Sequence, residues 1–453
     1  MRVVVAGAGE TGLAIAVNFT SGGHDVILLD HSVEALRLAE ESLDVMTLEG
    51  DVTHRDVLHR VEAGSADAFV AVTASDTDNI VGAGLAKQWG ARVAIARADD
   101  PRFYPSSVGV ERGLLGIDAV FCATRLAAAE LVGQLVGIHL RQIGSFASYS
   151  LRAALVTVGQ AEGLTGKPPL TIARVPGVRL CGVVRDGFVR PPVDIPRLEA
   201  EDQLLLVGDA EAFLDAWVTL LPEVARQRIL VVGGGDVGAL LAQSLARRFH
   251  RVELIERDRV RAQELSEDLP GVTVVHGDAR QAAFLKDLQI DAVGYLLAVT
   301  PDDEINLLVS LLARRLGVPH VLALLKQPGH AELFRELGVQ GAAGAFEVLA
   351  RAVQDEAVLA GAVREVDIPG TAYMLLEWRL PAGLVVEGEP PRLGQLPLTA
   401  GASVVAIARG ALTPAPTPEQ TLEGGVSLVL SLPRQERDEL TRRLTRLPKE
   451  WRT

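Results

Sequence analysis

Several residue types are scarce in this 453-residue chain, and each scarcity excludes a class of protein. Only two cysteines occur, Cys122 and Cys181, and they do not form a CxxC pair. A disulfide framework is therefore excluded, and we expect both to be small buried side chains in a reducing compartment. His54 and His59 lie five residues apart without a cysteine or acid at ligand spacing. We therefore predict no metal site.

Aromatic residues and positive charge are also scarce. Aromatics make up 4% of the chain, which is too few for platforms on which bases stack. Lys and Arg number 44 against 58 Asp and Glu, a net charge of −14. This balance opposes binding to nucleic acid, and the lack of basic clusters opposes anchoring on anionic lipid.

Long apolar runs are missing as well. The richest stretch, residues 306–325, is interrupted by Arg314 and Arg315, so no run reaches the ~18–20 residues of a membrane span. The first apolar run ends at a glycine turn after a few residues, unlike a signal peptide. We therefore expect a cytoplasmic protein of about two to four domains.

The most informative feature that is present is a pair of GxGxxG turns. Each follows a short apolar run, residues 2–6 and 228–232, and the second turn repeats the first at an offset of 226 (233 minus 7). One such motif is a weak signal, but two in equivalent βαβ units indicate an internal duplication. The two turns consist of Gly7, Ala8, Gly9, Glu10, Thr11 and Gly12, and of Gly233, Gly234, Gly235, Asp236, Val237 and Gly238.

The glycines of the first turn have separate tasks in a dinucleotide-binding fold. Gly7 makes the tight turn, Gly9 lets the backbone approach a pyrophosphate, and Gly12 lets the following helix pack closely on the sheet. The N-terminus of that helix offers free N–H groups to phosphates. The motif therefore predicts a phosphate-binding turn at the start of each half.

An acidic residue ends the second predicted strand of each half. Asp30 follows residues 25–29 and comes at an offset of 23 from Gly7 (30 minus 7), where an acid is expected to bind a ribose diol. A carboxylate there repels a 2′-phosphate, which favours NAD or adenosine nucleotides over NADP. Alternatively, Asp30 caps the helix that starts near Ser32. Glu256 is the counterpart of Asp30, at the offset of the two turns (256 minus 30).

Further strands and helices alternate, which predicts a doubly wound parallel sheet. Ligands bind such sheets at the carboxyl ends of the strands. Asp51 follows the third strand (45–48), Thr73 and Ala74 follow the fourth (68–72), and Arg97 follows the fifth (92–96). We expect them all at the ligand edge, although Thr73 could simply start a helix and Arg97 could lie on the surface.

The second half repeats these positions at an offset of 227. Asp278 corresponds to Asp51 and Thr300 to Thr73, and Asn306 corresponds to Asn79. Leu324 stands where the first half has Arg97, with Lys326 nearby. We therefore expect the two sites to prefer different nucleotides.

Each nucleotide-binding block is followed by a helical stretch, 124–140 or 346–363, and then by short β-like runs. The predicted fold class is α/β, with two Rossmann-like doubly wound parallel-sheet domains, each followed by a small α+β domain. We see no His–acid or Tyr–Lys constellation and predict no catalytic residues, which favours binding over catalysis. The expected segments are 1–122, a connecting helix 123–143, 144–224, then 226–345, a connecting helix 346–362, and 363–453.

This order of domains resembles the tandem RCK (KTN) family of bacterial potassium-uptake regulators. The resemblance is carried by the two glycine turns with Asp30 and Glu256, the Gly-Asp pairs ending in Asp51 and Asp278, and the segments around Thr73 and Thr300. It implies a fold of RCK N-terminal and C-terminal domains, in a non-enzymatic protein that gates a membrane potassium transporter by conformational change.

The resemblance further implies NAD(H) or adenine nucleotides such as ATP and ADP as ligands. It implies a homotetrameric ring, held at the inner face of the cell membrane only through an integral-membrane potassium transporter. By position, the glycine turn, Asp30, Thr73 and Arg97 would contact nucleotide in the first site. The glycine turn at 233–238 with Glu256, Asp278 and Thr300 would do so in the second.

Two alternatives remain open at the level of sequence. One is an NAD-dependent oxidoreductase, which steady hydride transfer with any substrate would favour. The other is a standalone sensor of a nucleotide, dinucleotide or cyclic dinucleotide with another partner, which the absence of a membrane transporter among its binding partners would favour.

Overall fold

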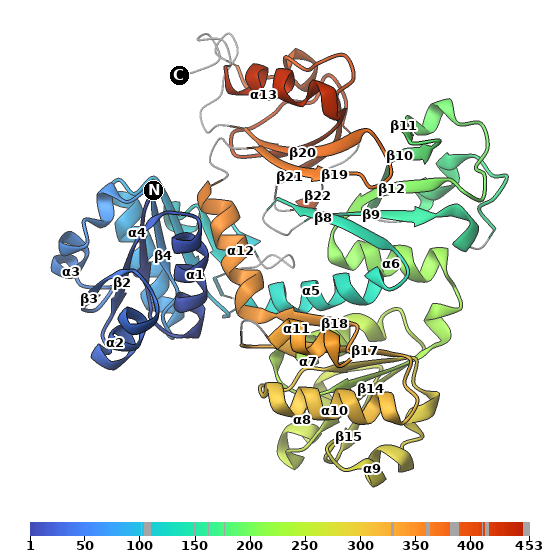
Figure 1. Cartoon of the computed structure of the whole chain (residues 1–453), viewed down its shortest axis with the longest axis horizontal. Helices are drawn as coiled ribbons and strands as arrows, with labels where there is room; N and C mark the ends of the chain where they lie inside the picture. Colours follow the sequence, from blue (N-terminus) through green and yellow to red (C-terminus); the bar gives the residue numbers. More distant parts are fainter. Residues whose placement is uncertain are drawn as a thin grey trace. The chain divides into compact units, whose positions relative to one another are not determined.

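The computed structural model describes residues 1–100, 102–103, 110–147, 151–161, 163–175, 177–327, 330–358, 363–380, 389–409, 411–412 and 416–446. The chain divides into two compact units. The first consists of Met1–Leu135 and Glu223–Ala357, and the second of Val136–Pro222 and Val358–Thr453. The parallel sheets belong to the first unit and the antiparallel sheets to the second (Figure 1).

The first parallel sheet has the strand order β3-β2-β1-β4-β5-β7-β6, in which only β6 runs antiparallel to its neighbour. Its strands are β1 (Arg2–Ala6), β2 (Asp25–Asp30), β3 (Met46–Glu49), β4 (Ala68–Ala71), β5 (Val93–Arg97), β6 (Val110–Glu111) and β7 (Ala119–Phe121). The helices are α1 (Glu10–Ser21), α2 (Val33–Ser42), α3 (Arg55–Arg60), α4 (Asp76–Gln88) and α5 (Ala123–Gly137).

The second parallel sheet repeats the arrangement with the order β15-β14-β13-β16-β17-β18. Its strands are β13 (Arg228–Val232), β14 (Arg251–Glu256), β15 (Val272–His276), β16 (Tyr295–Ala298), β17 (His320–Leu325) and β18 (Gly341–Gly344). The helices are α7 (Asp236–Ala246), α8 (Arg259–Asp268), α9 (Ala282–Asp287), α10 (Asp303–Arg315), α11 (His330–Glu336) and α12 (Ala345–Val358). The starts of β1 and β13 are separated by the same offset as the two glycine turns (228 minus 2), in accord with the duplication read from the sequence.

Burial explains why the central strands carry unbroken apolar runs. In β1, Val4 packs in the same core as Ile80 and Ala83 of α4, while its neighbours Val3 and Val5 are also fully buried. Helices therefore cover both faces of the sheet, as a parallel sheet requires. This places the carboxyl ends of the strands, with their polar residues, at the open edge.

The second unit contains two small antiparallel sheets, ordered β11-β10-β12-β9-β8 and β19-β20-β23-β21-β22. The first has β8 (Arg141–Phe146), β9 (Leu151–Thr157), β10 (Val178–Arg185), β11 (Phe188–Arg190) and β12 (Gln203–Gly208), with helix α6 (Ala210–Leu220). The second has β19 (Val363–Asp367), β20 (Tyr373–Arg379), β21 (Ser403–Arg409), β22 (Ala411–Leu412) and β23 (Ser427–Pro433), with helix α13 (Arg437–Thr445).

These two small sheets share one apolar core. Phe146 and Leu205 from the first sheet belong to the same buried cluster as Leu375 and Val429 from the second. The backbone N–H of Ala147 also donates to Oε1 of the buried Glu377 at 2.9 Å. The two small domains are thus one packed body, although a whole nucleotide-binding block separates them in the sequence.

The predicted fold class is confirmed, but both connecting helices were predicted too long. The first, expected over 123–143, ends at Gly137, and Arg141 begins β8. The helical stretch expected over 346–363 ends at Val358, and Val363 begins β19 instead. Residues 363–367 all pair with β20 in an antiparallel register, so the chain is a strand there. Among the described residues, no helix is long and apolar enough to cross a membrane.

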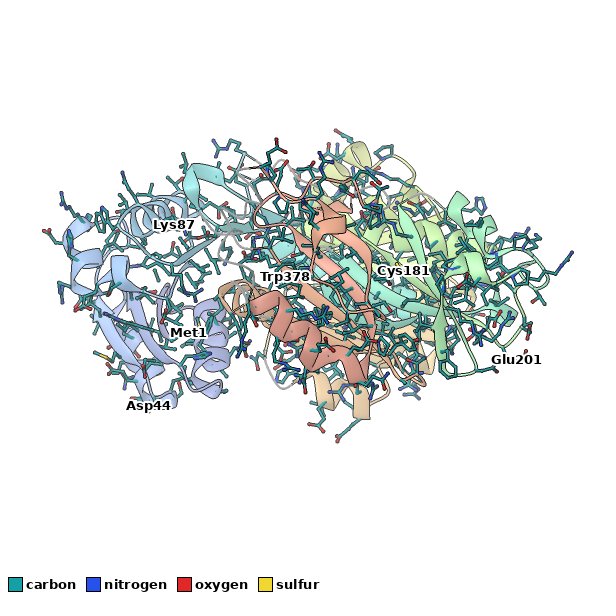
Figure 2. All side chains as sticks on the ribbon, turned by 90° about the horizontal axis from the view of Figure 1, so that it is seen from above. Met1, Asp44, Lys87, Cys181, Glu201 and Trp378 are labelled. Carbon is teal, nitrogen blue, oxygen red and sulfur yellow. The ribbon has the colours of Figure 1, made fainter. Side chains whose placement is uncertain are left out.

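The cysteines lie in the two units separately. Cys122 follows β7 and is fully buried. Cys181, labelled in Figure 2, lies in β10 and is half-buried. Desolvation raises the pKa of the Cys181 thiol to about 12, so it is protonated at neutral pH. Neither cysteine is in a disulfide.

Candidate nucleotide-binding sites

The first glycine turn links β1 to α1 with the geometry predicted for its three glycines. Gly7 has a φ of +109°, a conformation that side chains rarely adopt. A Cβ on Gly12 would overlap the carbonyl oxygen of Gly7, so α1 can approach the turn only with glycine there. A Cβ on Gly9 would meet nothing within 4 Å, because this residue faces open space. Gly9 caps the N-terminus of α1, whose first residue is Glu10.

Asp30 at the end of β2 is bound to this turn. Its Oδ2 accepts from the backbone N–H of Ala8 at 2.6 Å, and its Oδ1 accepts from the backbone N–H of Ser32 at 2.8 Å. The helix α2 is capped by Ser32, whose side chain accepts from the N–H of Ala35. The alternative that Asp30 is the helix cap is therefore wrong, and its carboxylate instead fixes the edge of the glycine turn.

Thr73 after β4 is held by a buried asparagine. The N–H and Oγ1 of Thr73 both donate to Oδ1 of Asn79, at 2.7 and 2.8 Å. The Nδ2 of Asn79 donates in turn to the carbonyls of Thr73 and Arg97. Asn79 is fully buried, so it fixes two strand ends at once. One sign of this role was present in the sequence, because the second half has Asn306 at the position equivalent to Asn79.

Arg97 at the end of β5 already has an acidic partner. Its Nε lies 3.0 Å from Oδ2 of Asp99, and both side chains are partly exposed. The carboxylate of Asp76 accepts from the backbone N–H groups of Asp99 and Asp100, which fixes the loop after β5. The positive charge that Arg97 presents is therefore reduced by an adjacent carboxylate.

One cavity brings together most residues predicted for the first site. The residues predicted for the first site that line it are Gly7, Gly9, Glu10, Thr11, Asp30, Thr73, Ala74 and Arg97. Four residues predicted for the second site also line this cavity, namely Gly235, Asp236, Val237 and Thr300. Ala8, Gly12 and Asp51 do not line it. Asp51 is instead engaged by Thr53, whose N–H and Oγ1 donate to its Oδ1, and this lowers the pKa of the Asp51 carboxyl.

The second glycine turn repeats the geometry of the first. Gly233 has a φ of +112°, and a Cβ on Gly238 would overlap the carbonyl oxygen of Gly233. The Oε2 of Glu256 accepts from the N–H of Gly234 at 2.7 Å, as Asp30 does from Ala8. The two halves therefore place a carboxylate against the glycine turn in the same way.

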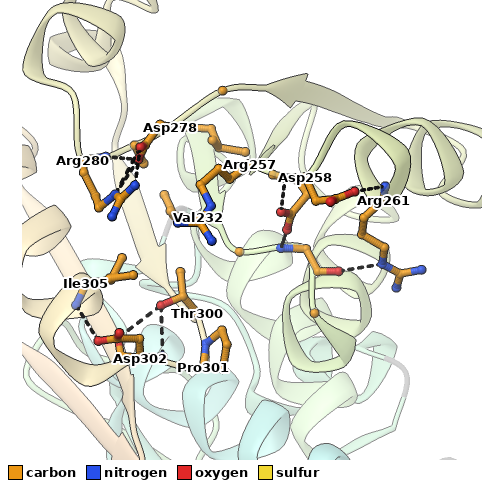
Figure 3. A pocket seen from close by; sticks show the side chains of 17 residues that line it. Val232, Arg257, Asp258, Arg261, Asp278, Arg280, Thr300, Pro301, Asp302 and Ile305 are labelled. Carbon is orange, nitrogen blue, oxygen red and sulfur yellow. Dashed lines mark hydrogen bonds and ion pairs between the residues drawn. The ribbon is translucent and has the colours of Figure 1, made fainter.

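A cavity of about 460 Å³ lies at the second site (Figure 3). The predicted residues that line it are Gly233, Gly234, Gly235, Glu256, Asp278 and Thr300, whereas Asp236, Val237 and Gly238 do not. Thr300 is held by Asn306, whose Oδ1 accepts from its N–H at 2.9 Å and from its Oγ1 at 2.8 Å. The Nδ2 of Asn306 donates to the carbonyl of Leu324, as Asn79 does to Arg97.

The second cavity also contains arginines that the sequence analysis did not single out. Arg257, Arg261 and Arg280 all line it. Arg280 forms hydrogen bonds to both carboxylate oxygens of Asp278, which lowers the pKa of Asp278 to about 2. Exposed arginines are common on protein surfaces, so the sequence did not mark these three as site residues. Only the fold shows that they line one cavity.

The groups at the carboxyl ends of the strands in the two parallel sheets are suited to binding a ligand. They offer backbone N–H groups, carboxylates and guanidinium groups around open space, the composition expected of a phosphate- and ribose-binding cleft. Among the described residues, no group of three or more His, Cys, Asp or Glu is arranged to hold a metal ion.

Two duplicated glycine-turn domains with antiparallel small domains define a tandem protein of the RCK class. The model of the TrkA-N domain matches residues 3–122 and 229–343, which is more than half of the chain. The chain therefore belongs to the TrkA family of Trk system potassium uptake proteins. The resemblance stated from the motifs is confirmed.

The relatives match over most of their length. A TrkA homolog of Archaeoglobus fulgidus is 31% identical over 75% of this chain and 77% of its own. A homolog of Methanosarcina mazei is 28% identical over 95% of this chain and 97% of its own. The TrkA protein of Vibrio alginolyticus is 28% identical over 74% of each chain.

Solved structures agree in fold. The GsuK RCK domain superposes with a TM-score of 0.55 and 20% identity, covering 98% of this chain and 94% of that one. The GsuK channel bound to NAD gives the same TM-score at 19% identity, covering 98% of this chain and 78% of that one. At this identity the likeness concerns the fold alone.

Proposed function

We propose that this chain is the cytoplasmic regulatory subunit of a Trk-type potassium uptake system, and that it binds NAD(H) or adenine nucleotides and gates the membrane transporter. The observation that carries the proposal is the repeated carboxylate–glycine turn contact, Asp30 to Ala8 and Glu256 to Gly234. The names of its relatives and the NAD bound in the GsuK channel support it.

In this proposal the pyrophosphate lies over Gly9 and Gly235, where the turns leave open space for it. Each oxygen of Asp30 accepts one backbone N–H, and a carboxylate oxygen has a second lone pair, which would accept from a ribose hydroxyl. Thr73 and Arg97 would contact the far end of a ligand in the first site. Asp278 and Thr300 would line the second ligand.

The regulatory step follows from linkage. A nucleotide changes the transporter only if it binds one conformation of the regulator better than another. We propose that the chain assembles as a homotetramer on an integral-membrane potassium transporter and performs no catalysis. We also propose the domain division 1–122, 123–143, 144–224, 226–345, 346–362 and 363–453.

The test is a thermal melt of the purified protein with NAD+, NADH, ATP, ADP or NADPH. A ligand at about 100 times its Kd adds about 2.7 kcal/mol of stability, which gives a readable shift in Tm. Asp30→Ala should remove the shift that belongs to the first site, and Glu256→Ala the shift that belongs to the second. Asp44→Asn, an exposed acid of the first domain outside the cavity (Figure 2), is the control and should keep both.

The opposite result is equally clear. If none of these nucleotides shifts the Tm of the wild-type protein, the glycine turns bind no nucleotide and the proposal fails. Steady turnover of NADH with a metabolite would point to the oxidoreductase instead.

A further inference from the structure

The two sites differ in where they carry positive charge. Positions 257 and 261 of the second half correspond to 31 and 35 of the first at the offset of 226, and position 280 corresponds to 53 at the offset of 227. The second half has arginine at all three, whereas the first has His31, Ala35 and Thr53. At the end of the fifth strand the difference is reversed, with Arg97 in the first half and Leu324 in the second.

The equivalence of these positions is structural as well as numerical. Thr53 and Arg280 both donate a backbone N–H to an aspartate oxygen two residues earlier, at 2.8 and 3.0 Å. Likewise, Asp30 and Glu256 both accept from the backbone two residues later, at 2.8 and 2.7 Å. Equivalent backbone therefore carries different side chains in the two halves. The three arginines line the second cavity, whereas only His31 of their counterparts lines the first.

Arg261 lies against the carboxylate that would face the ribose. Its Nε donates to the carbonyl of Gly234 at 3.1 Å, and the N–H of the same glycine donates to Oε2 of Glu256 at 2.7 Å. The guanidinium of Arg261 and the carboxylate of Glu256 thus both bind the backbone of Gly234. Arg261 is about one third exposed and lines the cavity, and its Nη1 also pairs with Oε2 of Glu264 at 3.1 Å.

Arg257 follows Glu256 directly and also lines the cavity. Figure 3 shows it between the Asp278–Arg280 pair and Asp258. No ion pair of its side chain is found among the residues that the structure describes, whereas Arg280 is occupied by Asp278. Arg257 is close enough to lower the pKa of Asp278, after the larger effect of Arg280. It is therefore a cation available to a ligand.

The chemistry of this edge is known in general terms. In dinucleotide-binding folds the acid after the second strand binds the ribose diol and repels a 2′-phosphate, while a nearby arginine accommodates that phosphate. In the described part of the chain, the one basic side chain paired with Asp30 is His31, whose Nδ1 lies 3.3 Å from Oδ1. Glu256 is followed directly by Arg257 and shares Gly234 with Arg261, and both of its oxygens accept backbone N–H groups. The repulsion of a ribose phosphate is therefore offset next to the acid of the second site, whereas the cations that line the first cavity, Arg97 and Lys326, come from other strand ends.

We propose that Arg257 and Arg261 form a phosphate subsite at the ribose edge of the second cavity, which binds adenosine nucleotides with an extra phosphate on the ribose, as in NADP(H). The first site, whose cavity contains Asp30 and His31 and lacks both arginines, takes nucleotides with a free ribose diol. This assignment rests on the proposed nucleotide-binding function and assigns a different ligand class to each site.

The test is calorimetric titration at pH 8, in an Asp30→Ala background that removes the first site. The probes are AMP, 2′,5′-ADP and 3′,5′-ADP, together with NAD+ and NADP+. The double variant Arg257→His/Arg261→Ala installs the residues of the first half. It should bind 2′,5′-ADP and NADP+ about tenfold or more weaker, the loss expected for charge-assisted hydrogen bonds, and change AMP and NAD+ by less than about threefold. Arg259→Ala removes one exposed arginine of α8 that lies outside the cavity. It is the control for losing a positive charge elsewhere on the same domain, and it should change the affinity for none of the probes.

The outcomes separate this inference from the proposed function. A preference for 2′,5′-ADP over AMP that the double variant abolishes supports a subsite for the 2′-phosphate, and the same result with 3′,5′-ADP supports one for the 3′-phosphate. Equal weakening of all probes, or a preference of the unmutated second site for NAD+ over NADP+, overturns the subsite and leaves the proposed function intact. Failure of every probe to bind the unmutated second site contradicts nucleotide binding there altogether.

Discussion

At the scale of single residues, the two buried asparagines are the side chains that join the strand ends of each site. Asn79 holds both Thr73 and the carbonyl of Arg97, and Asn306 holds Thr300 and the carbonyl of Leu324. Both are fully buried, so their hydrogen bonds are shielded from water. Asn79 positions the ends of β4 and β5, and Asn306 those of β16 and β17. Neither asparagine lines a cavity.

Replacing Asn79 with alanine should affect one site and spare the other. The loss leaves the N–H of Thr73 without its partner, which should cost about 1–3 kcal/mol of unfolding free energy. Nucleotide binding by the first site should weaken, and binding by the second should not. Urea unfolding and site-resolved calorimetry measure the two effects. Asn306→Ala should give the reverse pattern, and equal loss at both sites from either variant would contradict separate roles.

The Asp278–Arg280 pair predicts a pH dependence. The folded-state pKa of Asp278, about 2, lies below the ordinary value of 3.8 because of Arg280. The contribution of this pair is therefore present above pH ~4, and it is lost as the pH falls towards 2. The pair is partly exposed, so screening by solvent should keep its contribution to the unfolding free energy small.

The measurement compares the wild-type protein with Asp278→Asn by urea unfolding at pH 6, 4 and 3. The advantage of the wild type should be present at pH 6 and shrink between pH 4 and 3. An advantage that grows as the pH falls would show that the pair does not stabilise the fold through the ionised carboxylate.

At the scale of elements, the strand–turn–helix unit separates what the fold needs from what a ligand needs. Gly12 is required by the packing of α1 on the turn, since a Cβ there overlaps the carbonyl oxygen of Gly7. Gly9 is not required by packing, because a Cβ there meets nothing within 4 Å. The second turn repeats this contrast with Gly238 and Gly235.

Alanine at Gly12 should therefore lower the stability of the fold, whereas alanine at Gly9 should weaken nucleotide binding. Gly12→Ala should lower the unfolding free energy by about 1–3 kcal/mol, the usual cost of an overpacked site. Gly9→Ala should leave stability within about 0.5 kcal/mol of wild type and weaken nucleotide binding by the first site, because the methyl group occupies the space proposed for the pyrophosphate. Denaturant unfolding and calorimetry test both. Normal nucleotide affinity in a stable Gly9→Ala protein would place the ligand elsewhere.

The sequence was informative at the turns because their backbone geometry restricts which residues fit. Gly7 and Gly233 have positive φ values, and Asp30 and Glu256 each bind the turn that precedes them, so the motif reflects a physical requirement. The role of Asp30 was ambiguous because Ser32 is also a helix-capping residue. Only coordinates could show that Ser32 caps α2.

At the scale of the whole molecule, the sequence was least informative about the small domains. Strands such as β8 and β19 are short, and their apolar side chains pack in a core whose other members come from the opposite half of the chain. A local pattern cannot indicate a packing partner so distant in the sequence, as Phe146 and Ile368 are in this core. The arginines of the second cavity were missed for the same reason, because their convergence depends on the fold.

The shared core makes the two small domains interdependent. Leu375 and Val429 of the second small domain and Leu205 of the first are fully buried in it. Leu375→Ala should lower the unfolding free energy by about 2–5 kcal/mol and reduce amide protection in the strands of both small sheets. Hydrogen exchange resolved by peptide measures this, with Leu444→Ala, which lies in the separate core of the second small domain, as the control. Loss of protection confined to the second small sheet in Leu375→Ala would contradict a shared core.

The central claim is that nucleotide at the two duplicated turns controls potassium transport. The most direct measurement is potassium flux into proteoliposomes containing a Trk-type transporter and this protein, with and without NAD+, NADH, ATP, ADP or NADPH. Flux should change with at least one nucleotide, and the change should disappear in Asp30→Ala/Glu256→Ala while the variant still binds the transporter. A nucleotide effect that survives in that double variant, or transport that ignores all five nucleotides, would contradict the account.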